Sequence, residues 1–199
     1  FPSPALLQKY QVLGDLLDFY REKDPVGFGR FHDIERTYGI PVLFVNRTTA
    51  WYKSLPDFIQ GSGMFVWDTP VIWFNNWDLQ GIDPGMTVAV LMHEMCHVLG
   101  RWHPEELVKT EGLPAPPVDI YNWRTWAEHE IYCANIMLRT AKRLESTAGI
   151  QFAKDVARGN WGDMSRPERR VRVLATYGEW LDKELAASGY ALSALARVG

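Results

Sequence analysis

The residues best suited to chemistry are two histidines and a glutamate in the segment His93-Glu94-Met95-Cys96-His97. Two histidines four positions apart lie on one face of a helix, so both imidazoles can reach a single metal ion. This spacing is typical of zinc sites, with Zn–N distances of about 2.0–2.1 Å. We therefore expect one Zn²⁺ ion per chain, bound by His93 and His97.

Glu94 has the position of a general base. It follows His93 by about 100° round the helix, where its carboxylate reaches a zinc-bound water without binding the ion itself. Zinc lowers the pKa of such a water to about 7, and the carboxylate takes its proton before attack on a polarised carbonyl. The alternative is a pair of buried histidines that only form hydrogen bonds, which is costly beside a buried glutamate.

A catalytic zinc ion usually has three protein ligands and one open position, and the sequence offers two candidates for the third ligand. Glu130 is the favoured one, because it is the lone charge on an otherwise apolar face of a helix predicted over 125–144. A carboxylate on such a face needs a partner, and a metal ion is one. A salt bridge, for instance to Arg124, is the other explanation for Glu130.

His103 is the alternative third ligand. Residues 93–103 read H-E-x-x-H-x-x-G-x-x-H, in which Gly100 would end the helix and allow the chain to bring His103 onto the metal. This pattern resembles metzincins, although no convincing Met-turn accompanies it: Met137 falls in a predicted helix and Met164 lies far downstream. Otherwise His103 would simply precede Pro104 as the cap of the next helix.

With Glu130 as the third ligand, the sequence resembles gluzincins, zinc peptidases in which the metal glutamate lies on a later helix next to small residues. The positions that match are His93, Glu94, His97 and Glu130, with Cys133 and Ala134 as the small residues. Ala134 stands where thermolysin-like members carry a supporting Asp, and Asn135 is the nearest substitute. The resemblance implies a zinc-dependent peptidase acting on protein or peptide substrates.

The elements expected around this motif give an α+β, zincin-like fold. We predict helices over 5–22, 28–37, 83–99, 125–144, 167–186 and 191–197, strands over 40–45, 64–67 and 71–74, and a loop over 159–165. The zinc-binding helix would be central, between a small N-terminal sheet with helices and a helical C-terminal lobe. One metallopeptidase domain would span 1–199, with lobes of about 1–102 and 103–199.

Composition restricts the partners and the cellular location that we expect for the protein. The net charge is −3 and no basic stripe occurs, so we expect no nucleic-acid partner. No apolar run approaches the roughly 20 residues of a membrane span, and the N-terminal residues do not form a signal peptide. Two cysteines are too few for a disulfide framework. Analogy favours a secreted, periplasmic or translocated bacterial enzyme, such as a toxin domain. The sequence does not determine the oligomeric state.

Other functions and roles remain possible from the sequence. The alternatives to a peptidase are a zinc-stabilised interaction or regulatory domain without turnover and a hydrolase of cell-wall peptide crosslinks. Cys96 and Cys133 fall on two helices that we expect to pack together, as free thiols or as a disulfide. His129 is predicted to be half-exposed on a different helix face from Glu130, and therefore not a ligand.

Overall fold

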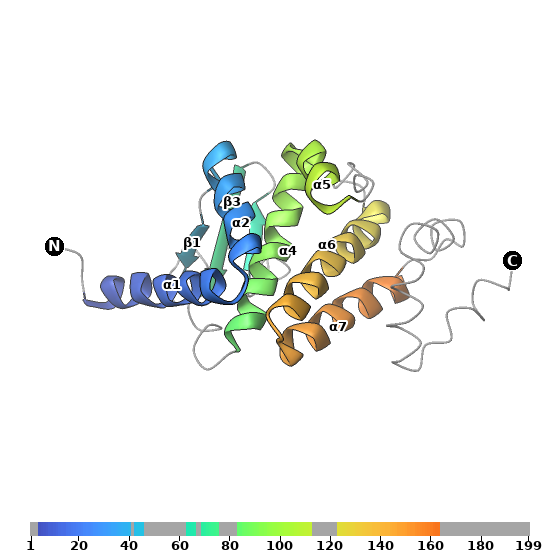
Figure 1. Cartoon of the computed structure of the whole chain (residues 1–199). Helices are drawn as coiled ribbons and strands as arrows, with labels where there is room; N and C mark the ends of the chain where they lie inside the picture. The colour runs from blue at the N-terminus through green and yellow to red at the C-terminus, as the bar shows by residue number, and fades with distance from the viewer. Residues whose placement is uncertain are drawn as a thin grey trace, which may run out of the picture.

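The structure, a computed structural model, describes residues 4–40, 42–45, 63–66, 69–75, 83–112 and 123–163. Its helices are α1 (Pro4–Lys23), α2 (Pro25–Tyr38), α4 (Pro84–Trp102), α5 (Pro104–Glu111), α6 (Trp123–Arg143) and α7 (Thr147–Asp163). Its strands are β1 (Val42–Val45), β2 (Gly63–Val66) and β3 (Thr69–Asn75). Figure 1 shows α6 and α7 running side by side next to α4.

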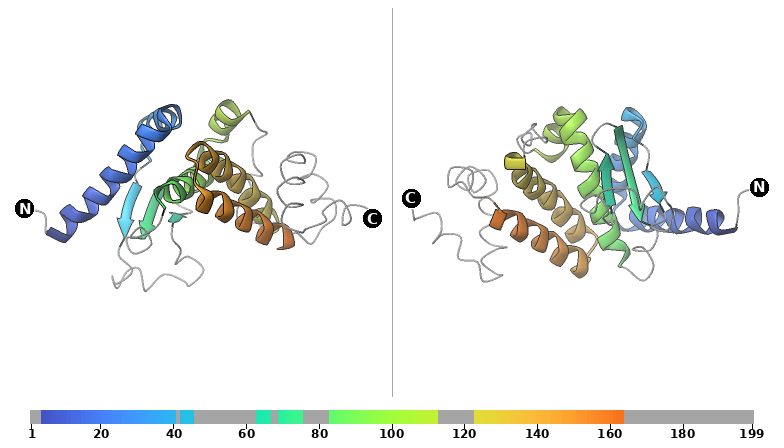
Figure 2. Two further views of the ribbon diagram at one scale, coloured as in Figure 1. Left: turned by 60° about the horizontal axis from the view of Figure 1, so that its bottom comes forward. Right: turned by 180° about the vertical axis from the view of Figure 1, so that it is seen from behind.

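Helix α4 lies at the centre of the molecule. It begins as its sequence predicts, with Pro84 in its first turn and the Asp83 carboxylate accepting a hydrogen bond from the Met86 amide at 3.2 Å. Nearly every side chain from Thr87 to Leu99 is buried, because a helix that is apolar all round must be covered on all sides. Helix α4 contacts strands β2 and β3 on one side and helices α6 and α7 on the other (Figure 2).

Helices α6 and α7 form an antiparallel pair joined by a tight turn at residues 144–146. Glu145 adopts a positive φ of 54°, and the Ser146 hydroxyl accepts a hydrogen bond from the Gly149 amide at 2.9 Å. The Ser146 hydroxyl also donates to the Asp83 carboxylate, which ties the start of α4 to this turn. Helix α7 as a whole is absent from the sequence prediction, and its last residues, 159–163, occupy part of the segment predicted to be a loop.

The strands form one small sheet in the order β1-β3-β2. Strand β1 is parallel to β3, and β2 is antiparallel to it, as expected for the hairpin predicted from the sequence. Of this sheet, Ile72 is fully buried and joins the core formed mainly by the helices. The sheet is therefore an addition to a helical core.

The predicted α+β fold class is wrong. Helices make up most of the described residues, and a sheet layer with helices against it does not define the architecture. The reason is that the apolar faces of α4, α6 and α7 cover one another, so most of the core is built by helix-on-helix packing.

Two helix boundaries also differ from the prediction. Helix α6 begins at Trp123, so Thr125 lies inside it and does not start it. Helix α4 continues through Gly100 to Trp102, because a single glycine costs a helix only about 1 kcal/mol and the Gly100 position is buried. The helices predicted over 167–186 and 191–197 lie outside the described residues. Within the described part, no helix has the length and apolarity of a membrane span.

Two glycines of α7 provide a matched test of this packing. At Gly149, an added Cβ would come within 2.9 Å of the Ser146 hydroxyl, 3.0 Å of the Ala141 Cβ and 3.2 Å of the Met86 backbone. At Gly159, it would meet nothing within 4 Å. We expect Gly149→Ala to destabilise the protein by about 1–3 kcal/mol through overpacking.

Gly159→Ala should instead stabilise the protein by up to about 1 kcal/mol, because alanine has the higher helix propensity. Urea unfolding followed by circular dichroism measures both changes. Equal effects of the two substitutions would show that the turn between α6 and α7 does not pack against α4 as described.

Candidate metal centre

Three side chains from two helices converge on one point in the core. On α4, the Nε2 atoms of His93 and His97 lie 3.0 Å apart. On α6, the two carboxylate oxygens of Glu130 lie 3.1 Å from Nε2 of His93 and 3.2 Å from Nε2 of His97. All three residues are buried or nearly so, and together they form a group that could hold a metal ion.

The spacing of these donor atoms is compatible with a bound metal ion. Ligands at about 2.0–2.1 Å from a tetrahedral ion are about 3.3 Å apart, close to the 3.0–3.2 Å observed. A neutral imidazole can direct the single hydrogen of its Nε2 at only one acceptor. Here both Nε2 atoms face each other as well as the carboxylate, so a cation at their centre satisfies all three groups.

The close approach of α4 and α6 depends on small residues between them. Cys96 on α4 and Cys133 and Ala134 on α6 are fully buried, and the two sulfur atoms lie 2.9 Å apart. This confirms that the two cysteine-bearing helices pack together. Both cysteines are free thiols, and the small side chains allow Glu130, one turn before Cys133 and Ala134, to reach the histidines.

The charges of the three groups stabilise one another. Burial alone would raise the pKa of Glu130, but His97 and His93 outweigh it and hold that pKa well below its usual value. For His93, burial acts to lower the pKa, yet the hydrogen bond and charge of Glu130 raise it overall. Glu130 is therefore an anion in the core, which is the form that binds a cation.

Glu94 lies beside this group. Its side chain is 8% exposed, and burial raises its pKa, partly offset by the nearby His93 and His97. It is not a member of the converging set found among the described residues. The two buried glutamates of this region thus differ: Glu130 faces both imidazoles directly, whereas Glu94 is adjacent to them.

The structure does not bring the alternative ligand His103 to this point. Because α4 continues past Gly100, His103 follows His97 by six residues, which is about 120° away round the helix axis. Its ring stacks on Tyr38 of α2, with ring centroids 3.8 Å apart. His103 stands at the N-terminus of α5 without a side-chain capping bond, so the prediction that it could complete the site is not supported.

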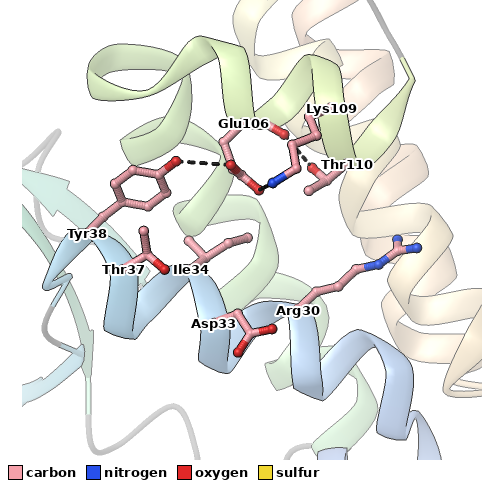
Figure 3. Close-up of a pocket in the computed structure, with 8 residues that line it drawn as sticks. All are labelled: Arg30, Asp33, Ile34, Thr37, Tyr38, Glu106, Lys109 and Thr110. Atoms are coloured by element: carbon pink, nitrogen blue, oxygen red, sulfur yellow. Dashed lines mark hydrogen bonds and ion pairs between the residues drawn. The ribbon is translucent and has the colours of Figure 1, made fainter.

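A pocket of about 440 Å³ lies between α2 and α5, on the side where His103 is found. Figure 3 shows Tyr38 donating a hydrogen bond to Glu106 across it, at 3.0 Å. Its lining combines two positive and two negative side chains: Arg30, Lys109, Asp33 and Glu106. None of its lining residues belongs to the converging group, so this pocket is separate from the candidate metal centre.

His129 differs most from its prediction. It is only 1% exposed, not half-exposed, and its ring lies nearly parallel to that of His97 with centroids 4.8 Å apart. With His97 and Cys133 it forms a second buried group that could hold a metal ion. The spacing of His129 and Cys133, four residues apart on one helix, is the sequence signal that could have identified this group.

Comparison with protein-family models, with curated proteins and with solved structures finds no match for this chain. The zincin resemblance therefore rests on the residues of this chain alone.

A pair of variants tests which residue completes the centre. We expect Glu130→Gln to weaken zinc binding by at least about tenfold, because it removes the anionic ligand, and His103→Ala to leave it unchanged. Metal-free protein is loaded with one equivalent of zinc, desalted and assayed for bound metal, and circular dichroism checks folding. Loss of zinc from His103→Ala alone would contradict the geometry described here.

Proposed function

We propose that this protein is a zinc-dependent peptidase in which His93, His97 and Glu130 hold the metal ion and Glu94 is the general base. The observation that carries the proposal is the convergence of two imidazole Nε2 atoms and one carboxylate, 3.0–3.2 Å apart, next to a buried fourth side chain that can accept a proton.

The donor set supports zinc. Two imidazoles with one carboxylate suit zinc, whereas magnesium and calcium take oxygen ligands almost exclusively. The number of ligands also supports a catalytic role. Structural zinc sites are closed by four protein ligands, commonly cysteines, while catalytic sites have three and leave one position for water or substrate.

When bound here, zinc would supply polarisation of a substrate carbonyl and would make a water molecule more acidic. The residues of this chain supply the rest. Glu94 accepts a proton from the attacking water at its carboxylate and returns it to the nitrogen of the departing amine. His93 and His97 are fixed by one helix, and Glu130 by the next, so the donors are already in place before substrate arrives.

A peptide bond is the substrate that this arrangement suits best. Hydrolysis of an unactivated amide needs a polarised carbonyl, an activated water and a proton for the leaving amine, and the proposed centre supplies all three. The gluzincin resemblance of His93, Glu94, His97 and Glu130 adds support. A zinc-stabilised domain without turnover would leave the position of Glu94 without a role.

The decisive variant is Glu94→Gln, which keeps the shape of the side chain and removes its basicity. We expect hydrolysis of a mixed peptide library, followed by mass spectrometry, to fall by roughly 10²–10⁴-fold. After loading with one equivalent of zinc, the variant should hold as much zinc as the wild type. Glu105→Gln serves as the matched control, since its side chain is 69% exposed and distant from the centre.

Two outcomes would overturn the proposal. Hydrolysis by Glu94→Gln at the wild-type rate would remove Glu94 from the mechanism. A zinc-loaded wild-type protein that cleaves no peptide in the library would favour the domain without turnover. If it cleaved only cell-wall fragments added to the same assay, the substrate class would be the peptide crosslinks of the wall.

A further inference from the structure

Helices α4 and α6 present two pairs of potential metal ligands with the same spacing. On α4 the pair is His93 and His97, and on α6 it is His129 and Cys133, each four residues apart and therefore on one helix face. The first pair belongs to the candidate metal centre. The second pair faces the opposite edge of the His97 ring, because Cys133 contacts Nδ1 of that ring while Glu130 contacts Nε2.

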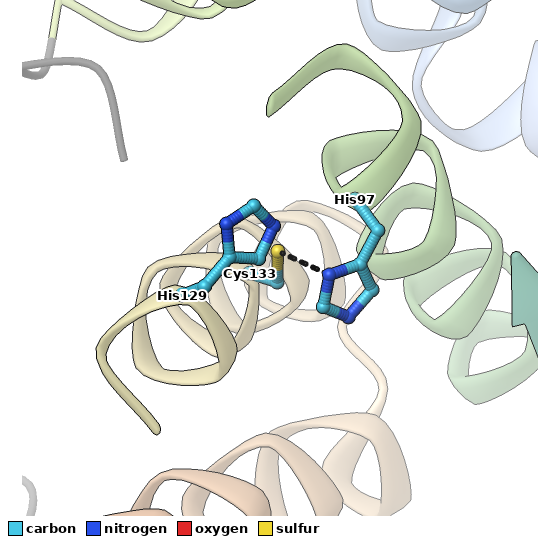
Figure 4. Close-up of side chains that lie close together, drawn as sticks. All are labelled: His97, His129 and Cys133. Atoms are coloured by element: carbon cyan, nitrogen blue, oxygen red, sulfur yellow. Dashed lines mark hydrogen bonds between the residues drawn. The ribbon is translucent and has the colours of Figure 1, made fainter. Parts of the chain in front are cut away.

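The geometry points to a second metal site at this edge: we propose that Cys133, His129 and Nδ1 of His97 bind a soft metal ion such as zinc. Figure 4 shows a ring nitrogen of each histidine turned toward the region of the Cys133 sulfur. The potential ligand atoms of the three residues lie within 4.8 Å of one another. All three side chains are at most 3% exposed.

One distance already matches coordination. With bonds of about 2.3 Å to sulfur and 2.0–2.1 Å to nitrogen, a tetrahedral ion separates a sulfur and a nitrogen ligand by about 3.5 Å. The Cys133 sulfur lies 3.5 Å from Nδ1 of His97. Because the His129 ring lies nearly parallel to that of His97, its side chain would have to rotate for its nearer nitrogen to reach the same ion.

The ligand set defines the class of metal. A thiolate with two imidazoles favours soft or borderline ions such as zinc, cadmium and copper(I) over magnesium and calcium. Binding of a divalent ion releases the thiol proton of Cys133 to solvent. When the first site is also filled, the proton on Nδ1 of His97 is released as well, and the imidazolate bridges the two ions.

The two sites share His97 but can be distinguished in a titration, because their other ligands differ. The first site offers only nitrogen and oxygen ligands, whereas the second includes one sulfur. Cobalt(II) replaces zinc in such sites and gives an intense near-ultraviolet charge-transfer band only when a thiolate is bound. Bound cobalt therefore reports which site is filled, without reference to any catalytic activity.

The experiment is an anaerobic titration of metal-free protein with cobalt(II), in the presence of a reductant that contains no thiol. We expect the first equivalent to give the weak visible bands of a nitrogen- and oxygen-ligated ion, and the second equivalent to add the thiolate band. The thiolate band should be absent from Cys133→Ser and from His129→Ala. It should remain in Cys96→Ser, whose sulfur is 2.9 Å from that of Cys133 but outside the group.

Several results would overturn the inference. A wild-type protein that shows no thiolate band in excess cobalt(II) has no such site, and this result requires no variant to fold. A band that persists in Cys133→Ser, or disappears in Cys96→Ser, would assign the thiolate to Cys96. Because the readout is spectroscopic, failure here leaves the proposed peptidase activity untouched, and inactivity toward peptides leaves this site untouched.

Discussion

Helices α4 and α6 pack against each other through polar and ionisable side chains as well as apolar ones. His93, His97, His129 and Glu94 are buried at or near this contact, and Glu130 is nearly so. Removing so many polar and ionisable groups from water is unfavourable unless they are paired or bind a metal. The pairing of Glu130 with His93 and His97 meets this requirement in part, and a bound cation would complete it by replacing the contact between the two Nε2 atoms.

The contact between α4 and α6 also explains the small residues in this part of the core, where larger side chains would bury more apolar surface. Cys96 and Cys133 meet at this contact with their sulfur atoms 2.9 Å apart, and a larger side chain at either position would push Glu130 away from the histidines. The turn at Ser146 holds the far ends of these helices, through its hydrogen bond to Asp83 and the close packing at Gly149. The convergence of the three potential ligands and the packing of the helices are therefore two consequences of one arrangement.

The parts of the centre that sequence predicts well are those set by a single helix. His93, Glu94 and His97 are related by helical periodicity alone, and Glu130 was identified because it is the only charge on an apolar helix face. His103 and His129 were misjudged because their positions depend on where α4 ends and how α6 is turned in the core. The end of α4 and the orientation of α6 are set by tertiary packing. Helix α4, for example, continues through Gly100, which is buried.

The fold was predicted less well for the same reason. Individual helices and the hairpin strands are local, and most were found near their expected residues. The predicted fold class was wrong because it depends on how α4, α6 and α7 pack into one helical core. That packing is a property of the assembled molecule and not of any single segment. The statement that the whole chain forms a single metallopeptidase domain with two lobes stays a prediction.

We propose that the first metal ion binds at His93, His97 and Glu130. X-ray absorption spectroscopy of protein loaded with one equivalent of zinc tests this assignment. We expect a shell of nitrogen and oxygen atoms at about 2.0–2.1 Å, with the scattering pattern of two imidazoles and no sulfur near 2.3 Å. A sulfur shell at this first equivalent, or a fully hydrated ion, would contradict it.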